Sequence, residues 1–85
     1  MAKIYKVIVE HGYYLFKLEV VLAEKKVSKS QLARETNTDF KVINRFVKGD
    51  LIKLDLDVLA RITTYLDCEI KDLIEYYPNN ITDGQ

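Results

Sequence analysis

Two helix-start signals stand close together in the middle of the chain and constrain its fold more than any other feature. Ser28 is followed by Gln31 at the spacing of a capping box, in which two side chains satisfy free N–H groups of a helix's first turn. Asp39 can cap a second helix. We therefore predict helices over residues 29–36 and 40–47. Two short helices separated by so tight a turn are typical of a helix-turn-helix unit.

The ends and the inner faces of these two helices have signals of their own. Asn37 tolerates the left-handed backbone conformation that closes a helix, and Gly49 adopts it without a steric penalty. The apolar residues lie at helical spacing and predict a stripe that faces the core, formed by Leu32, Ala33, Ile43, Phe46 and Val47.

The first part of the chain favours strands. Residues 3–9 are rich in β-branched and aromatic side chains and alternate in part between apolar and polar. His11 and Gly12 separate them from a second run at 13–16, so we predict a β-hairpin in which Gly12 supplies the positive φ of a tight turn. Residues 75–77 can return as a strand and pair with this hairpin.

Apolar spacing predicts three more helices, over residues 18–26, from a cap at Asp55, and over 70–74. The expected core positions are Leu18, Val21 and Leu22 in the first and Leu56, Leu59, Ile62, Thr63 and Leu66 in the second. The predicted fold class is mainly α, with five helices and an N-terminal hairpin. We divide the chain into the hairpin extension (1–17), the helix-turn-helix domain (18–77) and a disordered tail (78–85).

Composition narrows the possible functions. The chain has 85 residues, which fit a single domain, and its apolar runs fall far short of the ~20 residues that cross a bilayer. We expect a cytoplasmic protein without a membrane partner. His11 lies in a predicted turn with no nearby nucleophile, and the lone Cys68 lacks the second ligand of a zinc site, so its expected role is a small buried residue. We expect no enzymatic activity, cofactor, bound metal or small-molecule substrate.

Charge is distributed unevenly along a chain whose net charge is zero. Residues 25–53 contain eight basic and three acidic side chains, a net +5, and the remainder carries −5. A protein that presents one face to a polyanion needs this polarity. The alternative is a solvated, lysine-rich helical surface.

Five segments in register resemble the Cro and phage-repressor (XRE-type) helix-turn-helix family, over roughly residues 18–77. The matching residues are Leu22, Ala23, Glu24 and Lys25; Ser28, Gln31, Leu32, Ala33, Glu35 and Thr36; Ile43, Asn44, Arg45, Phe46, Lys48 and Gly49; Asp55, Leu56, Asp57, Leu59, Ala60 and Ile62; and Leu66 to Ile70 with Asp72 to Tyr76. The resemblance implies a five-helix, lambda-repressor-like fold whose third helix enters the DNA major groove, and a homodimer that represses promoters on two-fold operators.

This sequence departs from the family pattern at three positions near helix ends. Lys26 and Asn37 stand where many members have glycine, and Thr38 stands where an apolar residue is usual. The hairpin is an addition that the shortest members lack.

The resemblance places Phe40, Lys41, Asn44 and Arg45 at positions that read bases. Arg45 and Lys41 can donate to guanine, Asn44 can pair with adenine, and Phe40 can touch a thymine methyl. Ser28, Lys29 and Lys48 are expected to contact phosphates, with backbone amides at the starts of the two helices. Phe40 can instead pack on the preceding helix, Arg45 can pair with a local acid, and Ser28 can act as a cap alone.

Two functions remain open. The first is sequence-specific binding of double-stranded DNA by a transcriptional regulator. The second is a modulator or antirepressor on the same fold that binds another regulator protein, favoured by the zero net charge and by an aromatic residue at a base-reading position.

Overall fold

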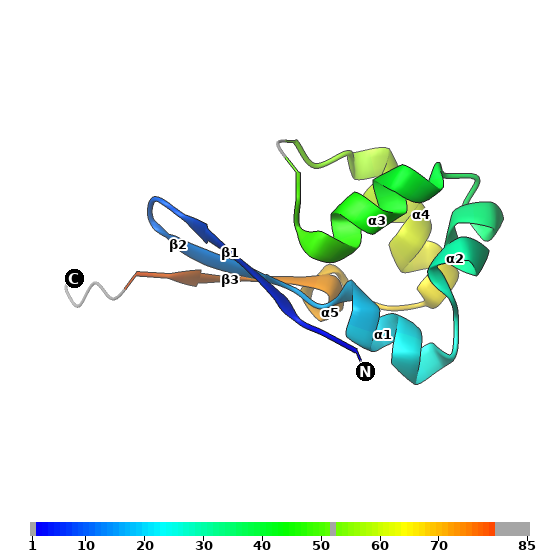
Figure 1. The fold of residues 1–85 in the computed structure, drawn as a ribbon, viewed down its shortest axis with the longest axis horizontal. Helices are drawn as coiled ribbons and strands as arrows, with labels where there is room; N and C mark the ends of the chain where they lie inside the picture. The colour runs from blue at the N-terminus through cyan, green and yellow to red at the C-terminus, as the bar shows by residue number, and fades with distance from the viewer. Residues whose placement is uncertain (1, 52, 80–85) are drawn as a thin grey trace.

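The computed structural model describes residues 2–51 and 53–79, and within them five helices flank a three-stranded sheet (Figure 1). In chain order the elements are β1 (Tyr5–Val9), β2 (Gly12–Phe16), α1 (Leu18–Lys25), α2 (Lys29–Glu35), α3 (Phe40–Lys48), α4 (Leu56–Leu66), α5 (Ile70–Leu73) and β3 (Ile74–Pro78). The prediction of a mainly α fold with five helices and a hairpin that pairs with a C-terminal strand is confirmed. Of the predicted tail, residues 80–85 lie outside the described residues, whereas Pro78 ends β3.

The sheet is antiparallel throughout, with β2 between β1 and β3. Its two ends differ in surroundings: near Phe16 the sheet packs on the helices, while the end with the β1–β2 turn projects away from them (Figure 1). This projection gives the molecule its long dimension of 45 Å, against 24 and 21 Å.

Gly12 has a different role from the one predicted. Positive φ among the described glycines occurs at Gly49 alone, and Gly12 is the first residue of β2. A Cβ at Gly12 would come within 2.2 Å of the Tyr77 carbonyl oxygen of β3. Glycine is therefore required at position 12 because the backbone of the neighbouring strand β3 lies so close. The turn itself consists of Glu10 and His11.

One core joins the helices to the sheet. It contains the predicted apolar stripes of α1, α2 and α3, most of that of α4, and Phe16 and Leu73. Phe16 of β2 meets Phe46 of α3 edge to face at 6.0 Å between ring centroids, a favoured aromatic geometry. The prediction for Leu56 is wrong: this residue opens α4 and is 72% exposed. Cys68 is only half-buried against the core, where burial raises the pKa of its thiol, with a further contribution from Asp72.

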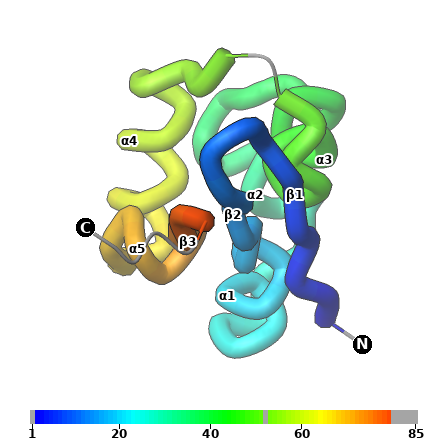
Figure 2. The backbone as a smooth tube through the Cα atoms, turned by 90° about the vertical axis from the view of Figure 1, so that its left-hand side faces the viewer, coloured from blue at the N-terminus to red at the C-terminus, as the bar shows by residue number. Residues whose placement is uncertain are grey.

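Figure 2 looks along the sheet from its projecting end and shows how the elements surround it. β1 lies on one side of β2, and β3 lies on the other, next to α5. The two edges of the sheet thus have different neighbours.

Candidate nucleic-acid interface

The turn between α2 and α3 brings the two predicted DNA-reading helices together. α2 ends at Glu35 with Thr36 as its C-cap, Asn37 follows with φ of 52°, and Asp39 caps α3 by accepting a hydrogen bond from the Lys41 N–H at 2.8 Å. Thr38 is half-buried and donates to the Thr36 carbonyl at 3.1 Å. Its hydroxyl thus closes the turn at a position where an apolar residue is usual.

The cap of α2 is half of the predicted capping box. Ser28 Oγ accepts from the Gln31 N–H at 3.0 Å, as expected. The Gln31 side chain does not return to Ser28 but donates to the Tyr65 hydroxyl of α4 at 3.1 Å. This hydrogen bond therefore replaces the reciprocal bond of the capping box and links α2 to α4. Ser28 remains exposed.

The third helix presents one polar face and buries the other. Ile43, Phe46 and Val47 are buried. The predicted contact residues lie on the remaining surface: Phe40, Lys41, Arg45 and Lys48 are exposed and Asn44 is half-buried. The ion pairs formed among the described residues involve other side chains, so Lys41, Arg45 and Lys48 keep their charges for an external partner. In the described part of the chain, Arg45 does not pair with an acidic side chain, so the alternative of a local ion pair is not observed there.

Lys29 and Asn44 form a contact that the sequence did not indicate. The half-buried Lys29, first residue of α2, donates from Nζ to Asn44 Oδ1 in the middle of α3 at 3.1 Å. The bond occupies one lone pair of the amide oxygen and turns that oxygen toward α2. Lys29 thus positions the Asn44 side chain, which was predicted to pair with adenine. This contact is additional to the phosphate contact predicted for Lys29.

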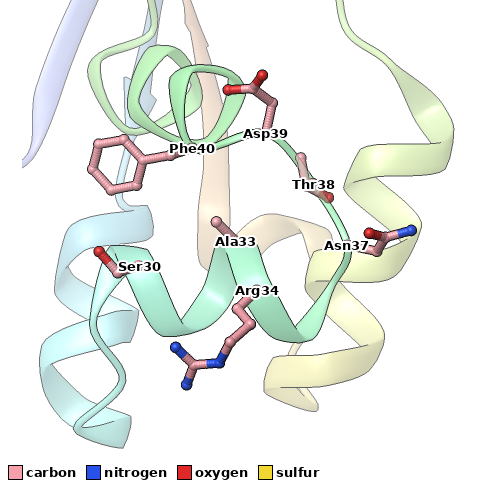
Figure 3. Close-up of a pocket in the computed structure, with 7 residues that line it drawn as sticks. All are labelled: Ser30, Ala33, Arg34, Asn37, Thr38, Asp39 and Phe40. Atoms are coloured by element: carbon pink, nitrogen blue, oxygen red, sulfur yellow. The ribbon is translucent and has the colours of Figure 1, made fainter.

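Phe40 only partly packs on the preceding helix. Its ring borders a shallow hollow between α2 and α3, near Ser30 and Ala33, with Arg34 on the outer side of α2 (Figure 3). The ring keeps 45% of its surface exposed. An aromatic side chain so placed can contact an apolar group of a partner.

Ser30, Arg34 and Arg61 are further polar groups beside this unit that were not among the predicted contact residues. Arg61 of α4 donates to the Thr38 hydroxyl at 3.3 Å, which supports the turn. Arg34 is exposed, and its Nε lies 3.8 Å from Glu35 Oε2. The positive net charge of residues 25–53 could have pointed to Arg34. Nothing near Arg61 in the sequence indicates its contact with Thr38, because the two residues are 23 positions apart.

Comparison with known families decides what this arrangement is. The model of the Cro/C1-type helix-turn-helix DNA-binding domain matches residues 17–79, about three quarters of the chain. The chain belongs to the Cro/C1-type helix-turn-helix family. The resemblance noted in the sequence is confirmed.

A solved structure shares the fold of this Cro/C1-type chain. The crystal structure of the transcriptional regulator VanUg superposes with a TM-score of 0.65 at 22% sequence identity and covers 86% of this chain and 96% of its own. No curated protein sequence matches. The structural match extends over more of the chain than the five helices alone, so it includes part of the sheet.

Two other kinds of feature do not occur in the described part of this Cro/C1-type domain. Within residues 2–51 and 53–79, His, Cys, Asp and Glu side chains form no group of three that could hold a metal ion. None of the helices in these same ranges is long and apolar enough to span a membrane.

Proposed function

We propose that this chain binds double-stranded DNA in a sequence-specific manner through α3 and acts as a transcriptional regulator, most simply a repressor. The observation that carries the proposal is the exposed face of α3, where Lys41 and Arg45, two cations one helical turn apart, lie near Asn44 and have no acidic partner among the described residues. An α-helix with such a face fits the major groove and matches the donor and acceptor pattern of base edges.

We assign two kinds of contact to this unit. Phe40, Lys41, Asn44 and Arg45 read bases, Arg45 by donating to guanine and Asn44 by pairing with adenine. Ser28, Lys29 and Lys48 contact phosphates, which fix the helix in register without reading sequence. Asp39 remains a cap, because a carboxylate beside DNA would be repelled. VanUg, whose structure is similar, is a transcriptional regulator, which supports this role, and two-fold operators in the family imply a homodimer.

Arg45→Ala tests the base-reading assignment. We expect the variant to lose about 1–3 kcal/mol of affinity for the preferred duplex and to discriminate less at one base pair, because a bidentate contact disappears. Titration of selected and scrambled duplexes by fluorescence anisotropy measures both effects. Lys71→Ala, which removes an exposed cation on α5, is the control and should bind like the wild type. Equal losses on both duplexes would contradict base reading by Arg45.

The bond between Lys29 and Asn44 can be tested separately from phosphate binding. Lys29→Ala should reduce the salt dependence of binding by about one counterion, as expected for any phosphate contact. It should also weaken the adenine preference that Asn44 supplies. A double-mutant cycle with Asn44→Ala should give a coupling of about 0.5–1.5 kcal/mol on the preferred duplex. Additive effects would mean that Lys29 does not position Asn44.

A modulator that binds another regulator protein is the second candidate. The exposed Phe40 ring and the zero net charge favour it, because interfaces between proteins are enriched in aromatic side chains. If the folded wild-type protein binds neither duplex at low salt, this candidate replaces DNA binding.

A further inference from the structure

The two edges of the sheet differ in the backbone groups that they offer. Asn79 N–H donates to the His11 carbonyl at 2.8 Å, and Lys17 N–H donates to the Leu73 carbonyl at 2.7 Å. These bonds place the odd-numbered residues of β2 in hydrogen-bonded pairs with β3. Because bonding alternates along an antiparallel strand, the even-numbered residues of β2 bond to β1.

The outer edge of β3 has few free groups. Its even-numbered residues point their N–H groups away from β2, and each of the two end positions is already closed. Ile74 N–H donates to the Ile70 carbonyl of α5, and Pro78 has no N–H. Proline at an outward position is a common way of preventing further strand pairing.

The outer edge of β1 is open. Tyr5, Val7 and Val9 pair with even-numbered residues of β2, so Lys6 and Ile8 point their N–H and C=O groups outward. No hydrogen-bond partner for these outward groups occurs in the described part of the chain. The Ile8 side chain is also 77% exposed, the highest value among the large apolar residues described. An apolar, unpaired edge of this kind is a template for another strand.

We propose that β1 pairs with β1 of a second copy of this chain, antiparallel, with the two-fold axis at Ile8. The charges of the edge are self-complementary in this register. Ile8 lies opposite its own copy, Val7 lies opposite the partner's Val9, and each Lys6 faces Glu10 of the partner, the first turn residue after β1. A register centred on Lys6 would oppose two ammonium groups, and one centred on Val7 would leave Lys6 opposite Ile8. Cross-strand pairs of opposite charge stabilise a sheet, and like charges destabilise it.

The resulting assembly is closed, and it suits the proposed function. Pairing by a two-fold axis uses up both β1 edges and leaves only the β3 edges outside, so growth stops at a dimer with a six-stranded sheet. The C-terminal end of α3 lies over the face of the sheet that carries Val7 and Phe16, since a Cβ at Gly49 would meet both side chains. An axis perpendicular to the sheet keeps both α3 helices on that same side. This inference rests on the homodimer proposed above and identifies its interface.

Sedimentation equilibrium without DNA, from micromolar to submillimolar protein, tests the proposal independently of DNA binding. We expect a dimer for the wild type. Lys6→Glu places carboxylates opposite Glu10 of the partner and should raise the dimer dissociation constant about tenfold or more. Lys3→Glu makes the same charge change outside the paired register and should leave the dissociation constant nearly unchanged.

The charge swap Lys6→Glu with Glu10→Lys separates an intermolecular pair from a local effect of Lys6, which also lies 4.3 Å from the Tyr13 ring centroid. Within one chain, β1 carries Lys6 away from Glu10, the first residue of the turn, at about 3.3 Å per residue, so the two side chains are too far apart to pair. Restored dimerisation therefore requires two chains. Circular dichroism verifies that each variant is folded, and Ile8→Glu provides a second disruption on the axis.

Three outcomes would overturn the proposal: a monomeric wild type over the whole range, equal effects of Lys6→Glu and Lys3→Glu, or no restoration by the charge swap. In each of these cases specific DNA binding by the same sample would leave the function of α3 intact. Conversely, a dimer with these charge effects and no affinity for DNA would support the interface and refute the proposed function.

Discussion

In the described part of the chain, residues with positive φ stand at the ends of four helices, and only one of them, Gly49, is a glycine. Lys26 follows α1 with φ of 58°, Asn37 follows α2 with φ of 52°, and Asp67 follows α4 with φ of 53°. At Lys26 and Asp67 the backbone N–H returns to carbonyls of the preceding turn, which ends the helix. The sequence indicated this conformation at Asn37. Lysine is disfavoured in the left-handed region, whereas aspartate tolerates it much as asparagine does, so the strain is greatest at Lys26.

Replacing Lys26 with glycine should therefore stabilise the domain. Lys26→Gly removes the crowding of a Cβ in the left-handed region, which outweighs the greater entropy of glycine in the unfolded chain. We expect the free energy of unfolding to rise by about 0.5–1 kcal/mol in urea denaturation. Lys25→Gly, at the last residue of α1, is the matched control, since glycine within a helix should lower the free energy of unfolding by up to about 1 kcal/mol. If Lys26→Gly and Lys25→Gly destabilise the domain by similar amounts, the backbone at Lys26 is not strained.

At the scale of elements, the sequence predicted which segments form strands and helices better than how the elements meet. Repeating apolar positions and cap residues are local signals, so all five helices and the hairpin could be found from them. The placement of β2 in the middle of the sheet, the contact of Gln31 with Tyr65 and the bond between Lys29 and Asn44 each join residues distant in sequence. The apolar spacing of α4 predicted a buried Leu56. This residue is exposed because the first turn of the helix lies beyond the edge of the core.

The junction of α3 with the sheet depends on Gly49. Its φ of 72° ends α3, and a Cβ there would lie 2.5 Å from a Val7 methyl group and 2.8 Å from the Phe16 ring. Gly49→Ala should cost about 2–4 kcal/mol, through the strained backbone and overpacking together. Thermal and urea unfolding measure the loss. Lys48→Ala, one residue earlier and exposed, should stay within about 0.5 kcal/mol of the wild type.

An ion pair between Lys17, which directly follows β2, and Glu75 of β3 makes the sheet sensitive to acid. Lys17 Nζ lies 2.9 Å from Glu75 Oε1, and the hydrogen bonds that Lys17 and the Tyr77 hydroxyl donate lower the pKa of Glu75 below its ordinary value of 4.5. A carboxyl whose pKa is lower in the folded state stabilises the fold above the unfolded pKa, and this contribution disappears as pH falls through the folded pKa.

Glu75→Gln should therefore lower the melting temperature slightly at pH 7 and flatten its decline below about pH 4.5. Melting curves at closely spaced pH values from neutral to strongly acidic conditions provide the measurement. Because the pair is partly exposed, high salt should reduce the difference between the variant and the wild type. If the melting temperature of the variant falls with pH in the same way as that of the wild type, Glu75 is not the source of the acid sensitivity.

For the whole molecule, the hairpin belongs to the same core as the helices. Although the sequence-based division sets residues 1–17 apart as an extension, Phe16 is 7% exposed and packs on Phe46, and Tyr5 and Val7 border the same core. Five of the six tyrosines lie in the sheet, and there is no tryptophan. Tyrosine fluorescence therefore reports mainly on the sheet, and far-ultraviolet circular dichroism reports mainly on the helices.

Phe16→Ala should destabilise both parts together. Emptying this site should cost about 3–5 kcal/mol, and the two spectroscopic signals should still change at one common midpoint. Leu56→Ala removes an exposed side chain and serves as the control, with little expected effect. Separate midpoints for fluorescence and circular dichroism would show that the sheet is an independent unit.

The central position of β2 also has a consequence for how the protein is made. β2 is synthesised before the helices, yet one of its two neighbours, β3, is translated only after all five of them. The hairpin can form early because its contacts are local, but one edge of β2 stays unpaired on the ribosome until residues 74–78 have emerged. Ribosomes that stall before this point would release chains in which one edge of β2 has no partner strand. We expect such fragments to be bound by chaperones or degraded.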